Sequence, residues 1–145
     1  PSRLSYYGHS RTGFERALSD FGAVEMEFGR ATTEMPLEQL RLFGETLMRA
    51  PHPPDGVVSI SGSSTVALVA GMEAAGKQLG RDVDLVSKHS ADFLNWIRPE
   101  IFTVNEDVRQ AGRELAKAVT ARIDGAAPET LQSIGQPVWS AMNTR

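Results

Sequence analysis

The sequence contains no cysteine, and this absence excludes several kinds of chemistry. Without thiols the chain can form no disulfide, no thiolate metal site and no cysteine nucleophile. A protein without disulfides suits a reducing compartment, and we expect it in the cytoplasm. The chain also has no apolar run of the roughly 20 residues that a membrane helix needs, and no signal-peptide pattern. We therefore expect no membrane contact.

Positive charge is not in surplus either. Lys and Arg number 15 against 18 Asp and Glu, which gives a net charge of −3. Nucleic-acid-binding surfaces usually carry a basic patch, so any DNA contact would have to lie in another part of the protein. The three histidines are His9, His52 and His89, and no second histidine stands at helical spacing from His89. We expect no metal site and no cofactor.

The stretch from Pro54 to Val86 organises what is present. Val57, Val58 and Ile60 form a short β-branched run, and the polar turn 61–64 follows it. An apolar helix, a glycine stop and a second strand at 83–86 complete a β-α-β unit. The polar turn then lies at the carboxyl end of a parallel strand, where open α/β sheets bind ligands.

Strands and helices alternate along the rest of the chain. The pattern predicts strands at 3–7, 24–28, 101–104 and around 137–139, helices at 10–21, from Pro36 to about 50 and at 106–123, and a packed loop or single helical turn at 91–98. Asn105 is predicted as the N-cap of the long helix, and Gly125 as the residue that ends it. The fold class is α/β: a Rossmann-like parallel sheet with helices on both faces.

Two familiar motifs are present only in part. The run 71–77 has the spacing of a phosphate-binding loop, but Gln78 stands where Ser or Thr should ligate magnesium, and a helix precedes it. We interpret this run as a helix end. The serines at 61–64 lack the G-x-S-x-G elbow of a serine hydrolase, so an α/β hydrolytic enzyme is the least favoured function.

Three features of the sequence can each be interpreted in two ways, and the residues alone do not decide between them. Lys88 and His89 end a strand at the same sheet edge as Ser61, and they are either ligand contacts or a solvated loop. Arg11 could clamp a hydroxyl pair or carboxylate with its planar fork, or it could be a surface residue. The apolar residues of 93–97 are either core or a patch covered by a partner subunit.

Four motifs together carry a resemblance to a known family. They are Gly13-Phe14 with Ala17-Leu18, Pro54-Asp55-Gly56-Val57-Val58, Ala75-Gly76 with Asp82-Val83 and Leu85-Val86, and Pro99-Glu100-Ile101-Phe102-Thr103-Val104. In order and spacing they resemble the effector-binding domain of LacI/GalR-family transcriptional regulators, mostly its carboxyl-terminal lobe. The resemblance covers about residues 4–125 and implies a periplasmic-binding-protein-like lobe.

The resemblance also implies a ligand site with altered chemistry. Ser61-Gly62 stands where the family has Asn-Asp, and Ser87-Lys88-His89-Ser90 stands where it has G-F-D-D. The family's effector-binding arginine is displaced by one residue to Arg11. The expected ligand contacts are Ser61, Gly62, His89, Lys88, Arg11 and Glu106. A sugar or sugar derivative is implied, and the charges of Lys88 and His89 favour an anionic one.

The function implied is ligand sensing and dimerisation without catalysis. A homodimer is expected through Val66, Phe93, Trp96 and Ile97. Because the chain starts without Met, we expect residues 1–145 to be a single-domain fragment that lacks the DNA-binding headpiece and most of the amino-terminal lobe, so that operator DNA is reached only through the missing part. The long helix should then pack on its own lobe or exchange within a dimer. A periplasmic-type solute-binding protein is the alternative.

Overall fold

A four-stranded sheet forms the centre of the molecule in the computed structural model, which describes residues 5–25, 35–89 and 93–140. The strands lie in the order β1 (Gly56–Ser59), β2 (Asp84–His89), β3 (Phe102–Asn105) and β4 (Val138–Ser140). The first three are parallel, and β4 pairs antiparallel with β3. The predicted α/β class with a mainly parallel sheet is confirmed.

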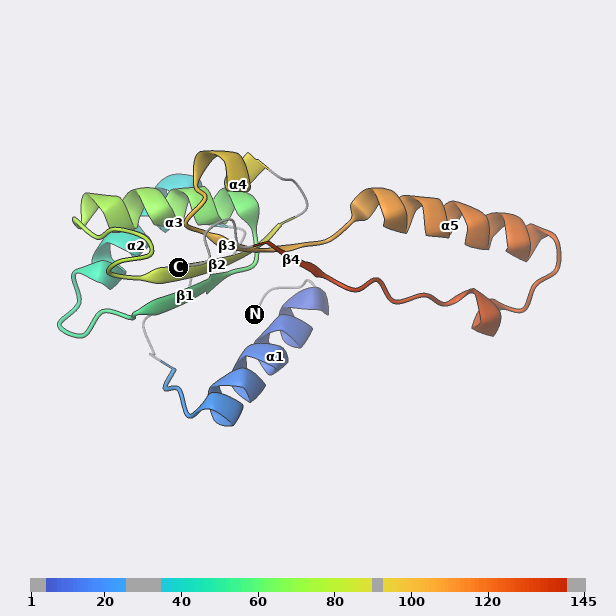
Figure 1. The fold of residues 1–145 in the computed structure, drawn as a ribbon, viewed down its shortest axis with the longest axis horizontal. Coiled ribbons are helices and arrows are strands. Elements are labelled where there is room, and N and C mark those ends of the chain that lie inside the picture. The colour runs from blue at the N-terminus through green and yellow to red at the C-terminus, as the bar shows by residue number, and fades with distance from the viewer. Residues whose placement is uncertain (1–4, 26–34, 90–92, 141–145) are drawn as a thin grey trace.

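Helices lie on both sides of this sheet (Figure 1). On one side are α2 (Leu37–Met48), α3 (Gly62–Ala74) and the single turn α4 (Phe93–Ile97), and on the other is α1 (Ser5–Phe21). The buried core lies between the α2–α3 layer and the sheet. Its buried members are Leu47, Met48, Leu68, Val69, Met72, Val83, Leu85, Leu94 and Ile101.

The two long helices of this layer cross at glycines. A Cβ at Gly44 would lie 2.7 Å from the backbone oxygen of Leu68, and a Cβ at Gly71 would overlap the backbone oxygen of Arg41. Both positions therefore need glycine because the helix backbones approach too closely for a side chain. The crossing fixes α3, whose first residues, 62–64, belong to the predicted polar turn 61–64.

The long helix α5 (Val108–Ile123) projects away from the sheet, and the chain returns through the 3₁₀ turn η1 (Pro128–Leu131) to β4 (Figure 1). None of its side chains is buried: Leu115 is 66% exposed and Ile123 is 80% exposed. The expected packing of its apolar face on its own lobe is not seen. Its exchange within a dimer stays a prediction.

Three predicted boundaries need correction. Residues 5–7 begin α1 instead of forming a strand, and the rest of the predicted strand 3–7 lies outside the described residues. The predicted stop at Gly22 is confirmed, because α1 ends at Phe21 and Gly22 follows with a φ of 64°. The predicted strand 24–28 falls mostly outside the described residues, and the two residues within them are not in a strand. The N-cap of α5 is Asp107, which accepts a hydrogen bond of 2.8 Å from Gln110 N, whereas Asn105 ends β3. The predicted stop at Gly125 is confirmed by its φ of 96°.

Candidate ligand-binding site

A row of hydroxyl side chains crosses the sheet just before the strands end. Ser59 is paired in register with Ser87, Ser87 with Thr103, and Thr103 with Ser140. Residues in register share a face, and the contact of Ser87 with Thr65 of α3 places this row on the side of the sheet that α2 and α3 cover. The core residues Leu85 and Ile101 stand two residues before Ser87 and Thr103 and so share their face of the sheet. Along this face, the buried side chains change from apolar to polar toward the carboxyl edge.

Ser61 begins the polar turn at this edge. It is the N-cap of α3 in position, but its side chain makes no cap bond and its Oγ instead lies 3.2 Å from Ser63 Oγ. Its backbone oxygen accepts from Thr65 N at 2.9 Å, Thr65 Oγ1 at 2.8 Å and Ser59 Oγ at 3.3 Å. Gly62, the first residue of α3, is half-buried. Hydrogen bonds to the backbone oxygen of Ser61 therefore stabilise the turn. Among the described residues, the Ser61 hydroxyl bonds only the hydroxyl of Ser63.

Lys88 and Glu106 come together as an ion pair, with Lys88 Nζ 3.0 Å from Glu106 Oε1. Lys88 lies near the end of β2 and Glu106 directly follows β3, so the pair spans two neighbouring strand ends. Two residues predicted from separate parts of the sequence thus share one place. The pair also balances the positive charge of Lys88, and the anionic ligand expected from Lys88 and His89 is not tested by this contact.

Asn105 was missed as a site residue because it was interpreted as a helix cap. Its Nδ2 donates to Thr103 Oγ1 at 3.4 Å, and Thr103 Oγ1 donates to Asn95 Oδ1 of α4 at 2.9 Å. In the described part of the chain, Asn105 Oδ1 is a buried side-chain acceptor with no hydrogen-bond partner. His89 ends β2 in register with Asn105. The signal available in the sequence was a polar residue at the end of an apolar strand.

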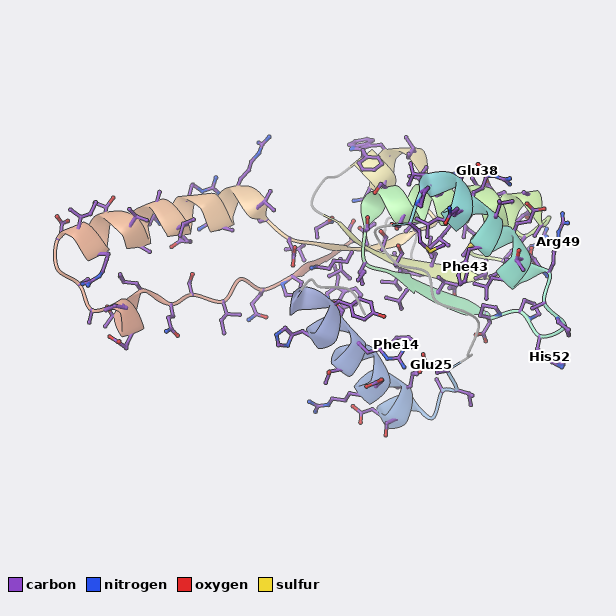
Figure 2. The ribbon with its side chains drawn as sticks, turned by 180° about the vertical axis from the view of Figure 1, so that it is seen from behind. Phe14, Glu25, Glu38, Phe43, Arg49 and His52 are labelled. Atoms are coloured by element: carbon purple, nitrogen blue, oxygen red, sulfur yellow. The ribbon has the colours of Figure 1, made fainter. Side chains whose placement is uncertain are left out.

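Arg11 is engaged by two carboxylates. Its Nε donates to Glu15 Oε1 at 2.6 Å, and its two terminal nitrogens donate to the carboxylate of Glu25 at 2.5 and 2.6 Å. Glu25 follows α1 and lies beside it (Figure 2). Bonding to Glu25 and then Glu15 raises the pKa of Arg11 above its usual value, so it stays charged. This geometry ties α1 to the segment after it, and a ligand role for Arg11 stays a prediction.

The four residues predicted for a dimer contact are all exposed, from 44% at Val66 and Phe93 to 78% at Trp96, with Ile97 at 57%. Val66 is in the first half of α3, and the other three are on α4, which lies beside the amino-terminal end of α3 (Figures 1 and 2). Each of these four apolar side chains is therefore accessible for the predicted contact. We name the surface formed by Val66, Phe93, Trp96 and Ile97 the α3–α4 patch.

One open cleft of about 410 Å³ lies elsewhere. It is lined at the carboxyl end of α3 by residues that include Glu73, Lys77 and Gln78, and by Arg98 and Glu100. Since α3 has 13 residues and a helix rises 1.5 Å per residue, this cleft is about 20 Å from the Ser61 turn. Arg98 and Glu73 are already paired at 2.9 Å. We favour the strand ends as the ligand site because parallel sheets present their binding edge there.

Among the residues that the structure describes, no group of three or more His, Asp or Glu side chains is arranged to hold a metal ion. Within the same residues, no helix has the length and apolar character needed to cross a bilayer.

A parallel sheet with polar side chains at its carboxyl edge defines an open α/β binding domain. A family model for the periplasmic binding protein-like domain matches residues 2–139, and the chain belongs to this family. No curated protein matches the sequence.

The fold is shared with LacI-family transcriptional regulators of known structure. A regulatory protein of the LacI family from Chloroflexus aggregans superposes with a TM-score of 0.83 at 17% identity, over 99% of this chain and 53% of that one. The transcription regulator CcpA of Lactococcus lactis gives 0.79 at 16% identity, over 97% and 51%. A LacI family transcriptional regulator from Enterococcus faecium, with bound ribose, gives 0.68 at 21% identity, over 86% and 46%. The chain therefore spans about half the length of these structures.

Proposed function

We propose that this chain is the effector-sensing lobe of a LacI-type transcriptional regulator and that it binds a sugar or sugar derivative at the carboxyl edge of its sheet. The observation that carries the proposal is the convergence of three strand ends, which bring the Ser61 turn, Lys88 and Glu106 to one edge. The shared fold with LacI-family regulators, one of them a ribose complex, supports it. Catalysis has no part in the proposed role.

The charge balance at this edge favours a neutral, polyhydroxylated ligand. Lys88 and Glu106 offer one cation and one carboxylate 3.0 Å apart, and the Ser61 hydroxyl can both donate and accept. Sugar hydroxyls also donate and accept, so they can bridge such a set without leaving a net charge unbalanced. The side-chain oxygen Oδ1 of Asn105 would accept a hydrogen bond from a ligand hydroxyl once the side chain turned toward the edge.

Regulation would require a second copy and a DNA-binding part. The α3–α4 patch offers the apolar surface for a homodimer. An effector that binds one closure state of the two lobes more tightly would shift the dimer toward that state and so change its affinity for operator DNA. The DNA contacts would lie in another part of the protein, which would work in the cytoplasm.

The test uses the full-length protein and the DNA upstream of its gene in an electrophoretic mobility assay, with D-ribose, D-glucose and D-gluconate as probes. We expect at least one neutral sugar to change the apparent DNA affinity. A Lys88→Ala variant should lose this response, and the matched Arg41→Ala variant, which breaks an ion pair of α2 remote from the edge, should keep it. Sugar binding by a protein without DNA affinity would instead indicate a solute-binding protein.

A further inference from the structure

A buried hydrogen-bond chain joins the two segments that would contact the ligand. Thr65 Oγ1 lies 2.7 Å from Ser87 Oγ and donates to the backbone oxygen of Ser61 at 2.8 Å. Ser87 directly precedes Lys88, and Ser61 forms the polar turn after β1. Thr65 and Ser87 are both completely buried.

The direction of this chain follows from counting hydrogens. A threonine hydroxyl has one hydrogen, and the carbonyl of Ser61 can only accept. When Thr65 donates to that carbonyl, Ser87 must donate to Thr65. The order is therefore Ser87 Oγ to Thr65 Oγ1 to Ser61 O, and every hydroxyl hydrogen in it is used.

Half of this arrangement is ordinary. A threonine in the first turn of a helix commonly bonds the carbonyl four residues earlier. The link from Thr65 to Ser87 is different because it crosses 22 residues of sequence and ties α3 to β2.

We propose that Thr65 and Ser87 are positioning residues that set the Ser61 turn relative to Lys88, an inference that rests on the proposed function of this edge. A serine at position 87 supplies the donor that the hydroxyl of Thr65 would otherwise lack, and the oriented Thr65 holds the carbonyl of the turn.

The first test needs no ligand. Amide chemical shifts are compared between the wild-type chain and Thr65→Val, which keeps the shape and removes both bonds. The shifts of residues 61–63 and of Lys88 should move, and Thr65→Ser, which keeps the hydroxyl, should restore them. The matched control is Thr103→Val, which removes an equally buried hydroxyl of the row that contains Ser87; this hydroxyl bonds Asn95 instead. Shifts at 61–63 no larger in Thr65→Val than in Thr103→Val would overturn the proposal.

A second variant keeps the proposal testable if Thr65→Val does not fold. Ser87→Ala removes only the link to β2 and leaves the bond from Thr65 to Ser61 in place. It should move the same amides in the same direction, by less. If Ser87→Ala instead left residues 61–63 unshifted, the link across to β2 would have no positioning role.

The ligand arm separates this proposal from the proposed function. Calorimetry with whichever neutral sugar the full-length wild-type protein binds should show affinity about tenfold weaker in Thr65→Val, the loss expected for a misplaced hydrogen-bonding group. Thr46→Val, which removes the same type of helical bond in α2, should bind as wild type. Binding of no sugar by the wild type would overturn the proposed function, whereas unchanged affinity in Thr65→Val would overturn the positioning role alone.

Discussion

At the scale of single residues, the proposed ligand preference rests on the pairing of Lys88 with Glu106. Its exposed position means that the pair adds little to stability, at most about 1 kcal/mol. Its larger effect is on charge, since a carboxylate 3.0 Å from the ammonium group opposes the binding of another anion.

Removal of that carboxylate charge should change the ligand preference. We expect Glu106→Gln to bind D-gluconate at least tenfold more tightly than the wild type, with an affinity that falls as salt is added. Calorimetry on both proteins measures this change. Glu114→Gln, which removes a carboxylate from the exposed face of α5, is the matched control. An unchanged preference in Glu106→Gln would mean that the pair does not govern ligand charge.

The sequence was sufficient to place Ser61, Lys88 and Glu106 near strand ends, because strand ends follow from local patterns. It could not show that Lys88 meets Glu106, since this contact depends on which strands are neighbours. Asn105 was misassigned for a related reason. Asn, Glu and Asp in a row all suit a helix start, and only the structure shows that the strand uses Asn105 while Asp107 makes the cap.

At the scale of helices and strands, the glycine crossing of α2 and α3 holds the layer that supports the Ser61 turn. Gly71 is buried, and a methyl group there would overlap the backbone oxygen of Arg41. Backbone cannot move aside as a flexible side chain can, so the helices would have to separate.

Gly71→Ala should therefore lower the free energy of unfolding by about 3 kcal/mol, at the upper end of the usual cost of overpacking. Gly112→Ala in α5 is the matched control, because nothing lies within 4 Å of the position where its Cβ would be. We expect that change to stabilise α5 by up to about 1 kcal/mol through helix propensity alone. Urea denaturation measures both. Equal effects of the two substitutions would contradict the close crossing.

The sequence predicted most of the helices and strands, but it did not predict which of them contact one another. The helical spacing of Phe14, Ala17, Leu18 and Phe21 predicted α1, but a strand was assigned to the residues before it because short aromatic runs suit either structure. The pattern of α5 predicted an apolar face correctly. The expectation that its own lobe would cover this face failed because periodicity says which side is apolar, not what covers it.

At the scale of the whole molecule, the proposed regulator should be a dimer through the α3–α4 patch. Trp96 is 78% exposed in the chain alone, and large exposed aromatic side chains are typical of contact surfaces. A charged side chain at this position should weaken dimerisation, because a second copy would bury the charge without a partner.

Sedimentation equilibrium of the full-length protein should show a dimer, and Trp96→Asp should weaken its dimerisation by at least a hundredfold, as expected for a hot-spot residue. The control is Trp139→Asp in β4, also exposed but outside the patch. A wild-type monomer, or a dimer that Trp96→Asp leaves intact, would contradict the assignment of this surface.

The central claim is that ligand binds where the parallel strands end. Amide chemical-shift mapping of the full-length protein with a bound neutral sugar tests it most directly, because the two candidate places are about 20 Å apart. The account predicts the largest shifts at residues 61–63, 87–89 and 105–106. Shifts concentrated instead around Glu73, Lys77 and Arg98, which line the other cleft, would contradict it.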